Sequence, residues 1–283
     1  MKNVSIIGVG LIGGSFALNL KAIFNDLIIL GIDSSKSHIS EALDLGIIDK
    51  EGSFESIIKS DLVVIATPVN VNLELLPTIL NRISSKALVV DMGSTKADIC
   101  NLVDMHPKRS QFLANHPIAG TEFSGPGSAY ISLFKNKINI VCDIEKTNPE
   151  LGNPLIKTFK NMGMNIRYMD SKAHDKHIAY VSHLSHISSF MLGKTVIEKE
   201  KNERNIFDMA GSGFESTVRL AKSSPEMWTP IFEQNKTNVI ETLEEYIQNL
   251  NHFKSLMEAN DFEAIRNEMK NTNYIKTILK GIS

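Results

Sequence analysis

Short apolar runs alternate with helical patterns from the start of the chain to about residue 169. The runs that predict strands are Val4–Ile7, Leu27–Ile32, Leu62–Ala66, Ala87–Asp91, Phe112–Asn115, Ile138–Cys142 and Asn165–Met169. An uninterrupted apolar run is typical of a strand covered on both faces, and therefore of a mostly parallel sheet. The segments between the runs, such as 73–81 and 149–162, predict crossover helices. This alternation predicts a doubly wound α/β domain.

The pattern changes at Ser171, after which strand signals vanish. Helices are expected over about 172–200, 215–222, 226–257, 260–270 and 273–280. We therefore predict an α/β domain over residues 1–169 and an all-α domain over residues 170–283.

The helices after Pro225 carry apolar residues at helical spacing: Ile231, Phe232, Val239, Ile240, Leu243 and Ile247. This spacing predicts an apolar helix face. We expect that face to bury a two-fold interface between two copies of the chain. The alternative is that it closes the core of its own domain.

A glycine-rich turn, Gly8-Val9-Gly10-Leu11-Ile12-Gly13, follows the first strand and opens a helix. Gly8 permits the tight turn, Gly10 lets the backbone approach a pyrophosphate, and Gly13 lets helix and strand pack closely. The helix N-terminus directs free N–H groups and a positive dipole end at the phosphates. The α/β domain is therefore predicted to be Rossmann-like, with Gly8, Gly10, Leu11, Ile12 and Gly13 contacting a dinucleotide.

Asp33 ends the second predicted strand, at the distance of about 20 residues from the glycine turn where an acid binds the adenosine ribose. A carboxylate there repels a 2′-phosphate, which favours NAD over NADP. The alternatives are a glycine turn with a helix-capping Asp, and FAD binding. Thr67 and Pro68 follow another strand, at the sheet edge where open α/β sheets place ligands, and are expected to contact the cofactor.

Three further side chains are candidates for the chemistry. His116 follows a strand, and an imidazole suits a dehydrogenase that needs a base for a hydroxyl proton near neutral pH. Ser94 also follows a strand, where it can contact the nicotinamide or the substrate, or cap a helix. Arg219, at a glycine turn entering a helix, is a bidentate binder of carboxylates, or a solvated surface residue.

Composition narrows the classes of protein. The chain is 42% hydrophobic and 22% charged, with a formal net charge of -2, which does not favour nucleic-acid or membrane-surface binding. No apolar stretch approaches the ~18 residues of a membrane span, and no signal-peptide pattern opens the chain. Two cysteines fit a reducing compartment, so we expect a cytoplasmic protein. An anionic substrate then needs a local basic pocket.

Four histidines begin the helical domain: His174, His177, His183 and His186. On a continuous helix the first two lie on one side and the last two on roughly the opposite side, so no metal site is expected. Ser182, His186 and Ser189 share one face, which can present polar groups to a ligand or to another helix.

Three blocks in this order resemble the prephenate dehydrogenase family. Residues 116–122 with Ser124-Gly125 resemble its His-Pro-Ile-Ala-Gly-Thr-Glu-x-Ser-Gly block. Residues 182–186 resemble its Ser-His-Leu-Pro-His helix, and 210–221 followed by Met227-Trp228 resemble its glycine–Arg–Trp block. With the glycine turn, the resemblance covers nearly the whole chain.

The resemblance implies an NAD-dependent enzyme that oxidatively decarboxylates prephenate in tyrosine biosynthesis, and a helical domain that forms a homodimer. It implies that His116 is the base for the ring C4 hydroxyl, that Ser94 assists it, and that Arg219 holds a substrate carboxylate. The other implied substrate contacts are Ser182, His183 and His186 lining the pocket, Thr121 and Glu122 at its mouth, and Trp228 packed nearby.

Departures from the family pattern leave the choice between prephenate and arogenate open. Ser185 stands where Pro is usual, Ser212 where Gly is usual, and Ser216 where an acid is expected. Two other readings remain. A β-hydroxyacid dehydrogenase would carry a catalytic Lys in the first helix of its second domain, but residues 178–192 contain none. A non-catalytic NAD-binding protein would not need His116, His186 and Arg219 in one cleft.

Regulation is expected to use the substrate pocket. The segment after Lys254 is too short for an independent domain of about 50 residues. Inhibition by tyrosine is therefore expected to be competitive with prephenate.

Overall fold

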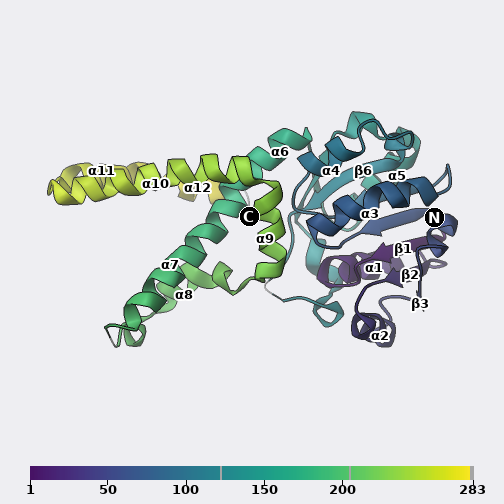
Figure 1. Cartoon of the computed structure of the whole chain (residues 1–283), viewed down its shortest axis with the longest axis horizontal. Helices are drawn as coiled ribbons and strands as arrows, with labels where there is room; N and C mark the ends of the chain where they lie inside the picture. The colour runs from purple at the N-terminus through teal and green to yellow at the C-terminus, as the bar shows by residue number, and fades with distance from the viewer. Residues whose placement is uncertain (122, 204, 281–283) are drawn as a thin grey trace. The chain divides into compact units, whose positions relative to one another are not determined.

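The protein is described by a computed structural model that covers residues 1–121, 123–203 and 205–280 (Figure 1). The strands are β1 Asn3–Ile7, β2 Ile28–Ile32, β3 Lys50–Glu51, β4 Leu62–Ile65, β5 Leu88–Asp91, β6 Phe112–Pro117, β7 Ile138–Cys142 and β8 Asn165–Met169. The α-helices are α1 Leu11–Ile23, α2 Lys36–Asp44, α3 Val69–Arg82, α4 Ala97–Leu102, α5 Pro149–Asn161, α6 Ser171–Ile178, α7 Leu184–Glu200, α8 Ser212–Val218, α9 Pro225–Gln234, α10 Lys236–Glu258, α11 Phe262–Thr272 and α12 Ile275–Lys280. The chain forms two compact units, Met1–Lys236 and Thr237–Ser283.

Within the described residues the strands form one eight-stranded sheet in the order β3-β2-β1-β4-β5-β6-β7-β8. All neighbouring pairs are parallel except β6 and β7, which are antiparallel. The seven predicted strands are confirmed to within two residues at each end. The two-residue strand β3 was not predicted, because Lys50-Glu51 carries no apolar pattern.

The sheet has a hydrophobic core on each face. In β4, Leu62 and Val64 belong to the core that contains α1, whereas Val63 and Ile65 belong to the core that contains α3. Successive side chains of a strand point to opposite faces, so a run that is apolar at every position requires a cover on both. The prediction of a doubly wound α/β domain is confirmed, and Figure 1 shows helices on the two sides of the sheet.

The predicted helix over 172–200 is interrupted. A π-helical segment, Ala179–His183, lies between α6 and α7. One turn of this kind advances the chain by more residues than an α-turn does, and such turns are frequent at functional sites.

The prediction of a single helix over 226–257 is wrong, because α9 ends at Gln234 and α10 begins at Lys236. Asn235 separates them. Its side chain is buried and donates a hydrogen bond of 2.7 Å to the carbonyl oxygen of Asp175. The break therefore places an amide where it joins the end of α9 to α6.

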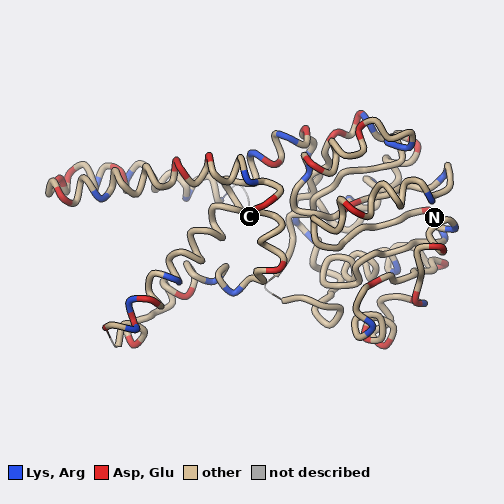
Figure 2. Tube along the Cα trace, in the orientation of Figure 1, with Lys and Arg blue, Asp and Glu red and all other residues tan. Residues whose placement is uncertain are grey.

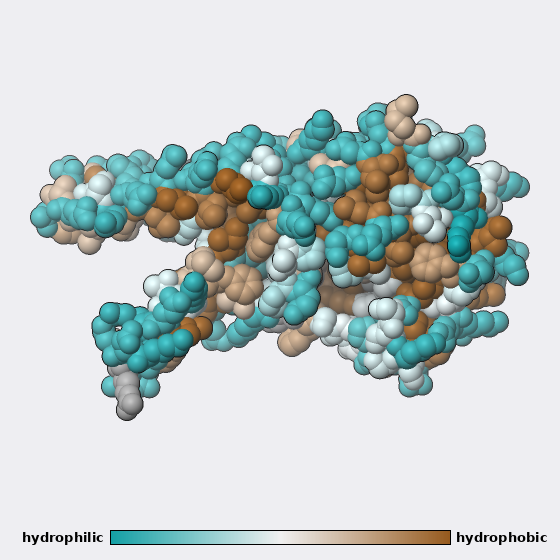
Figure 3. Space-filling model, viewed as in Figure 1, coloured by the Kyte–Doolittle hydropathy of each residue, from teal (hydrophilic) through white to brown (hydrophobic). Residues whose placement is uncertain are grey.

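The second unit exposes an apolar surface. The exposed apolar residues on α10, α11 and α12 are Ile240, Ile247, Leu250, Phe253, Met257, Phe262, Met269, Ile275, Ile278 and Leu279. Figure 3 shows hydrophobic residues gathered along one side of the arm that these helices form. Figure 2 shows that basic and acidic residues are interspersed along the chain. In the part of the chain that is described, no helix is long and apolar enough to cross a membrane.

Candidate active site

The glycine turn after β1 has the geometry that a dinucleotide requires. Gly8 has a φ of +88°, and a Cβ there would lie 2.6 Å from the carbonyl oxygen of Ala66. A Cβ on Gly13 would lie 2.0 Å from the carbonyl oxygen of Gly8, so the strand and α1 pack backbone to backbone. A Cβ on Gly10 would meet only the Gly125 amide at 3.9 Å, and α1 has no side-chain cap. The first turn of α1 begins with Leu11 and Ile12, and no side chain caps its backbone N–H groups. Together with the glycine turn it forms a cradle suited to a pyrophosphate.

Asp33 follows β2 at the edge of this cradle. One carboxylate oxygen accepts the Val9 amide at 3.1 Å, and the other accepts the Ser35 amide at 2.9 Å. The carboxylate thus holds the glycine turn and keeps lone pairs for ribose hydroxyls. Nδ1 of His38 lies 3.6 Å from a carboxylate oxygen of Asp33. The alternative of a helix-capping Asp33 is wrong, because Ser35 caps α2.

Thr67 and Pro68 lie in the turn between β4 and α3. Pro68 precedes the first residue of α3, and the Thr67 hydroxyl lies 2.6 Å from the side-chain oxygen of Asn72. Because β1, β4, β5 and β6 are parallel, this turn opens at the same sheet edge as the glycine turn.

His116 lies near the end of β6 at that edge and is 9% exposed. Its Nδ1 lies 2.8 Å from Nε2 of His174, and Nδ1 of His174 lies 2.7 Å from a carboxylate oxygen of Asp175. His174 and Asp175 are 1% and 3% exposed. Neither residue was predicted from the sequence to take part in the chemistry. The adjacent His-Asp pair at the first turns of the helical domain is the signal that could have found them.

Asp175 also fixes the loop that carries Ser94. Its two carboxylate oxygens accept the backbone amides of Lys96 and Ala97, each at 2.8 Å. A carboxylate from α6 therefore caps α4, and the alternative of Ser94 as the cap is wrong. Ser94 itself is partly exposed in the loop after β5, the strand beside β6.

A buried ion pair lies beneath the same loop. The ammonium of Lys96 contacts the carboxylate of Asp91, and neither side chain is exposed. Asp91 also accepts the backbone amides of Gly93 and Asn115, at 3.2 Å each. Burial raises the pKa of Asp91, and the Lys96 ammonium opposes that shift. Sequence reasoning did not single out this pair.

The imidazoles of the site favour the neutral form. Burial holds the pKa of His116 well below its usual range, and electrostatic interactions with His174, Lys96 and His183 lower it further. Burial lowers the pKa of His183 to about 4. Burial also lowers the pKa of His186, assisted by the charge of Arg219. A neutral imidazole is the form that can accept a proton.

The π-helical segment brings polar residues of the helical domain to one side. The prediction that placed His174 and His183 on opposite sides assumed one continuous α-helix, and the π-helical segment interrupts that helix. Both are buried, and the Asn235 amide reaches both the Asp175 carbonyl and Nδ1 of His183, the latter at 3.2 Å. A π-turn contains more residues than an α-turn, so it changes the phase between the two histidines.

Trp228 forms a wall with two of the predicted pocket residues. Its ring stacks on that of His186, with centroids 3.6 Å apart, and meets the ring of His183 edge-on at 5.7 Å. His186 donates from Nδ1 to the carbonyl oxygen of Ser182 at 2.9 Å, which leaves Nε2 of a neutral His186 as an acceptor. His183 is 1% exposed and supports the wall from behind.

Arg219 is exposed and opens the short 3-10 helix Arg219–Lys222. Ser189 of α7 ties this helix down, because its hydroxyl donates to the Thr217 carbonyl at 3.0 Å and accepts the Ala221 amide at 3.1 Å. Thr121 is exposed, and its hydroxyl accepts the Phe123 amide at 3.2 Å. Glu122 lies outside the described residues.

These features together define a class. A dinucleotide cradle and a buried neutral imidazole open at one sheet edge, and a nearby helical region supplies a cationic side chain. Such a site can take a proton from a hydroxyl while a nucleotide takes a hydride. The fold and the site are those of a nucleotide-dependent dehydrogenase.

The chain belongs to the prephenate dehydrogenase family. The family model for the prephenate dehydrogenase nucleotide-binding domain matches residues 16–168, and that for the prephenate dehydrogenase dimerization domain matches residues 170–271. The chain is 32% identical over 272 residues to prephenate dehydrogenase of Bacillus subtilis, an alignment that covers 93% of this chain and 72% of the relative. The protein is an oxidoreductase of this family.

Two solved structures extend the similarity. Prephenate dehydrogenase of Aquifex aeolicus, in complex with hydroxyphenyl propionate and NAD+, matches with a TM-score of 0.91 and 33% identity, covering 99% of this chain and 98% of that one. Synechocystis arogenate dehydrogenase matches with a TM-score of 0.79 and 25% identity, covering 98% and 99%.

Proposed function

We propose that the protein catalyses the NAD-dependent oxidative decarboxylation of prephenate to 4-hydroxyphenylpyruvate, a step of tyrosine biosynthesis. The observation that carries the proposal is His116, a buried imidazole held neutral at the same sheet edge as the glycine turn. Its position suits a base that acts beside a bound nicotinamide.

The reaction moves one proton and one hydride from the C4 carbinol group of the substrate. His116 accepts the proton of the C4 hydroxyl as the C4 hydride leaves, and NAD, when bound, supplies the acceptor for that hydride. The bond between the ring and its carboxylate then breaks. Its electron pair moves through the ring to the new ketone oxygen as carbon dioxide departs, which leaves an aromatic phenolate. His116 then returns its proton to the phenolate oxygen, so no net proton is consumed. Ser94 assists at the same hydroxyl.

Substrate binding is assigned mainly to residues of the helical domain. Arg219 binds a substrate carboxylate. Its charge acts on His186, which supports a shared site, and Ser189 positions its helix. His186 and Ser182, with Trp228 stacked behind, line the pocket, and Thr121 lies at its mouth. Orientation of a dianion by such groups supplies much of the rate enhancement in reactions of this kind.

The cofactor is NAD, bound by Gly8, Gly10, Leu11, Ile12 and Gly13. Asp33 supports this choice, because its carboxylate sits beside the Val9 amide where a 2′-phosphate would be repelled. Thr67 and Pro68 complete the cofactor contacts.

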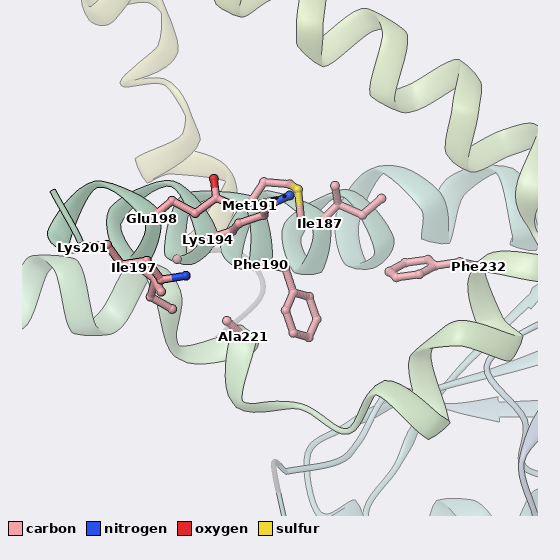
Figure 4. A pocket seen from close by; sticks show the side chains of 10 residues that line it. Ile187, Phe190, Met191, Lys194, Ile197, Glu198, Lys201, Ala221 and Phe232 are labelled. Carbon is pink, nitrogen blue, oxygen red and sulfur yellow. Dashed lines mark ion pairs between the residues drawn. The ribbon is translucent and has the colours of Figure 1, made fainter.

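A homodimer through the helical domain, here residues 170–283, completes the proposal. The match of residues 170–271 to a dimerization domain supports it. An open, largely apolar groove supports it as well: Phe190 of α7 and Phe232 of α9 face a common space, and Ile187, Met191 and Ile197 continue it along α7 (Figure 4). The buried thiols of Cys100 and Cys142 and the use of NAD fit a cytoplasmic enzyme.

The test is a matrix of two substrates and two cofactors. The purified protein is given prephenate or arogenate, each with NAD or NADP, and the appearance of reduced nicotinamide is followed. The proposal predicts the highest kcat/KM with prephenate and NAD. Equal or better use of NADP would contradict the role of Asp33, and higher kcat/KM with arogenate would contradict the substrate. The variant Asp33→Ser is expected to narrow the difference between the two cofactors without changing the substrate preference.

A further inference from the structure

Three buried side chains form one hydrogen-bonded line that ends at His116. The line runs from the Asp175 carboxylate to Nδ1 of His174 at 2.7 Å, and from Nε2 of His174 to Nδ1 of His116 at 2.8 Å. Asp175 and His174 both come from α6, whereas His116 comes from β6. The imidazole planes are inclined by 67°. Each of the two hydrogen bonds thus involves an identified ring nitrogen.

The direction of each hydrogen bond follows from the first acceptor. The Asp175 carboxylate accepts two backbone amides, from Lys96 and Ala97, so it acts as an ionised acceptor. Nδ1 of His174 must then carry a hydrogen and donate it. In a neutral His174 the other nitrogen, Nε2, is bare and can only accept, so Nδ1 of His116 must be the donor. A neutral His116 consequently has a bare Nε2, the nitrogen that can take a proton from a substrate.

We propose that His174 and Asp175 are positioning residues that hold His116 with its Nε2 bare and that share the proton which His116 takes from the substrate. The identity of the substrate rests on the proposed function, whereas the arrangement of protons in the free enzyme does not. As Nε2 of His116 gains the hydroxyl proton, the hydrogen on Nδ1 of His116 passes to Nε2 of His174. Reversal of both transfers returns the proton to the phenolate oxygen.

The charges around the line favour this movement. Burial and the interactions of His116 with His174 and Lys96 lower the pKa of His116 and so oppose a proton on it. The Asp175 carboxylate is in direct contact with Nδ1 of His174, at 2.7 Å. Asp91 offsets Lys96. The contact with Asp175 provides His174 with a carboxylate partner inside a buried site, so the line offers the proton a second position next to His116.

Nitrogen NMR of the free enzyme tests the arrangement directly. In protein labelled with ¹⁵N-histidine, the protonated and bare nitrogens of a neutral imidazole resonate in separate regions, and ring couplings identify each nitrogen. Near neutral pH we expect His116 and His174 both to carry their hydrogen on Nδ1. Variants of each histidine assign the signals. A His116 with its hydrogen on Nε2, or a doubly protonated His174, would overturn the proposal.

Two substitutions of His174 separate its roles. The side-chain oxygen of Gln in His174→Gln can accept the His116 hydrogen bond but cannot take the proton, so kcat is expected to fall on the order of tenfold. His174→Leu removes both functions and is expected to lower kcat on the order of 10²-fold, within the range of a general base's contribution. The matched control is His177→Gln, on the same helix but exposed, and it should retain wild-type kcat.

These outcomes are distinguishable from a failure of the proposed function. If prephenate is not the substrate, the NMR result for the free enzyme stands unchanged. If the tautomers are as expected but His174→Leu and His174→Gln lose kcat equally, His174 acts only through packing and the proposal fails. A His174→Leu enzyme with wild-type kcat would also overturn it.

Discussion

At the scale of single residues, the pKa of His116 sets the expected pH dependence. Its pKa is depressed by burial and by electrostatic interactions with its neighbours. The neutral, proton-accepting form therefore persists as pH falls below about 6.5, the ordinary value for an imidazole. We predict that kcat/KM for prephenate loses activity on the acid side only below that pH. An acid limb at or above the ordinary imidazole value would contradict the depressed pKa.

Arg219 carries a separate prediction at this scale. Removing it leaves a substrate carboxylate without its charged partner, at a cost of about 1.5–3 kcal/mol for a hydrogen bond to a charged group. Arg219→Ala should therefore raise KM for prephenate by about tenfold or more, with little change in KM for NAD. The control is Lys222→Ala in the same short helix. The Lys222 ammonium lies 3.9 Å from a carboxylate oxygen of Glu215, and its removal should leave KM for prephenate near the wild-type value. Equal effects of Arg219→Ala on both KM values would indicate a structural Arg.

At the scale of elements, the contact between β1 and α1 depends on a missing side chain. A Cβ on Gly13 would lie 2.0 Å from the Gly8 carbonyl oxygen, a distance that requires the backbone to move. Gly13→Ala is expected to lower the free energy of unfolding by about 1–3 kcal/mol and to weaken NAD binding. Gly120→Ala, where nothing lies within 4 Å, is the control. Urea unfolding measures the first effect, and a Gly13→Ala protein as stable as the control would contradict it.

Some elements of the fold were predictable from the sequence and others were not. The strands were predictable because each is a run of buried apolar residues, and the cradle was predictable because glycine has few other reasons to recur at that spacing. The π-helical turn and the break at Asn235 were not. Both depend on tertiary contacts, such as the hydrogen bond from Asn235 to the Asp175 carbonyl, which leave no periodic trace. The contact between His174 and His116 was equally hidden, because the two residues lie 58 positions apart in the chain and meet only through the packing of α6 against β6.

At the scale of the whole molecule, the exposed apolar residues of the helical domain predict association. Ile240 and Ile247 on α10 are 44% and 46% exposed, and apolar faces of this kind mark interaction surfaces. We predict a homodimer by light scattering, which Ile247→Lys should weaken because a charge would be buried at the interface. Met105→Lys, at an exposed apolar residue of the other compact unit, should leave the dimer intact. A monomeric wild-type protein would refute this prediction.

In the proposed function, His116 takes the substrate's proton at a site that binds NAD and prephenate. One comparison tests it most directly: the turnover of prephenate with NAD by the wild-type protein and by His116→Asn, with NAD affinity measured on both. We predict that the wild type reduces NAD, and that His116→Asn lowers kcat on the order of 10²–10⁴-fold, as for a lost general base, while NAD affinity stays near that of the wild type. A variant that keeps most of its kcat would contradict the account.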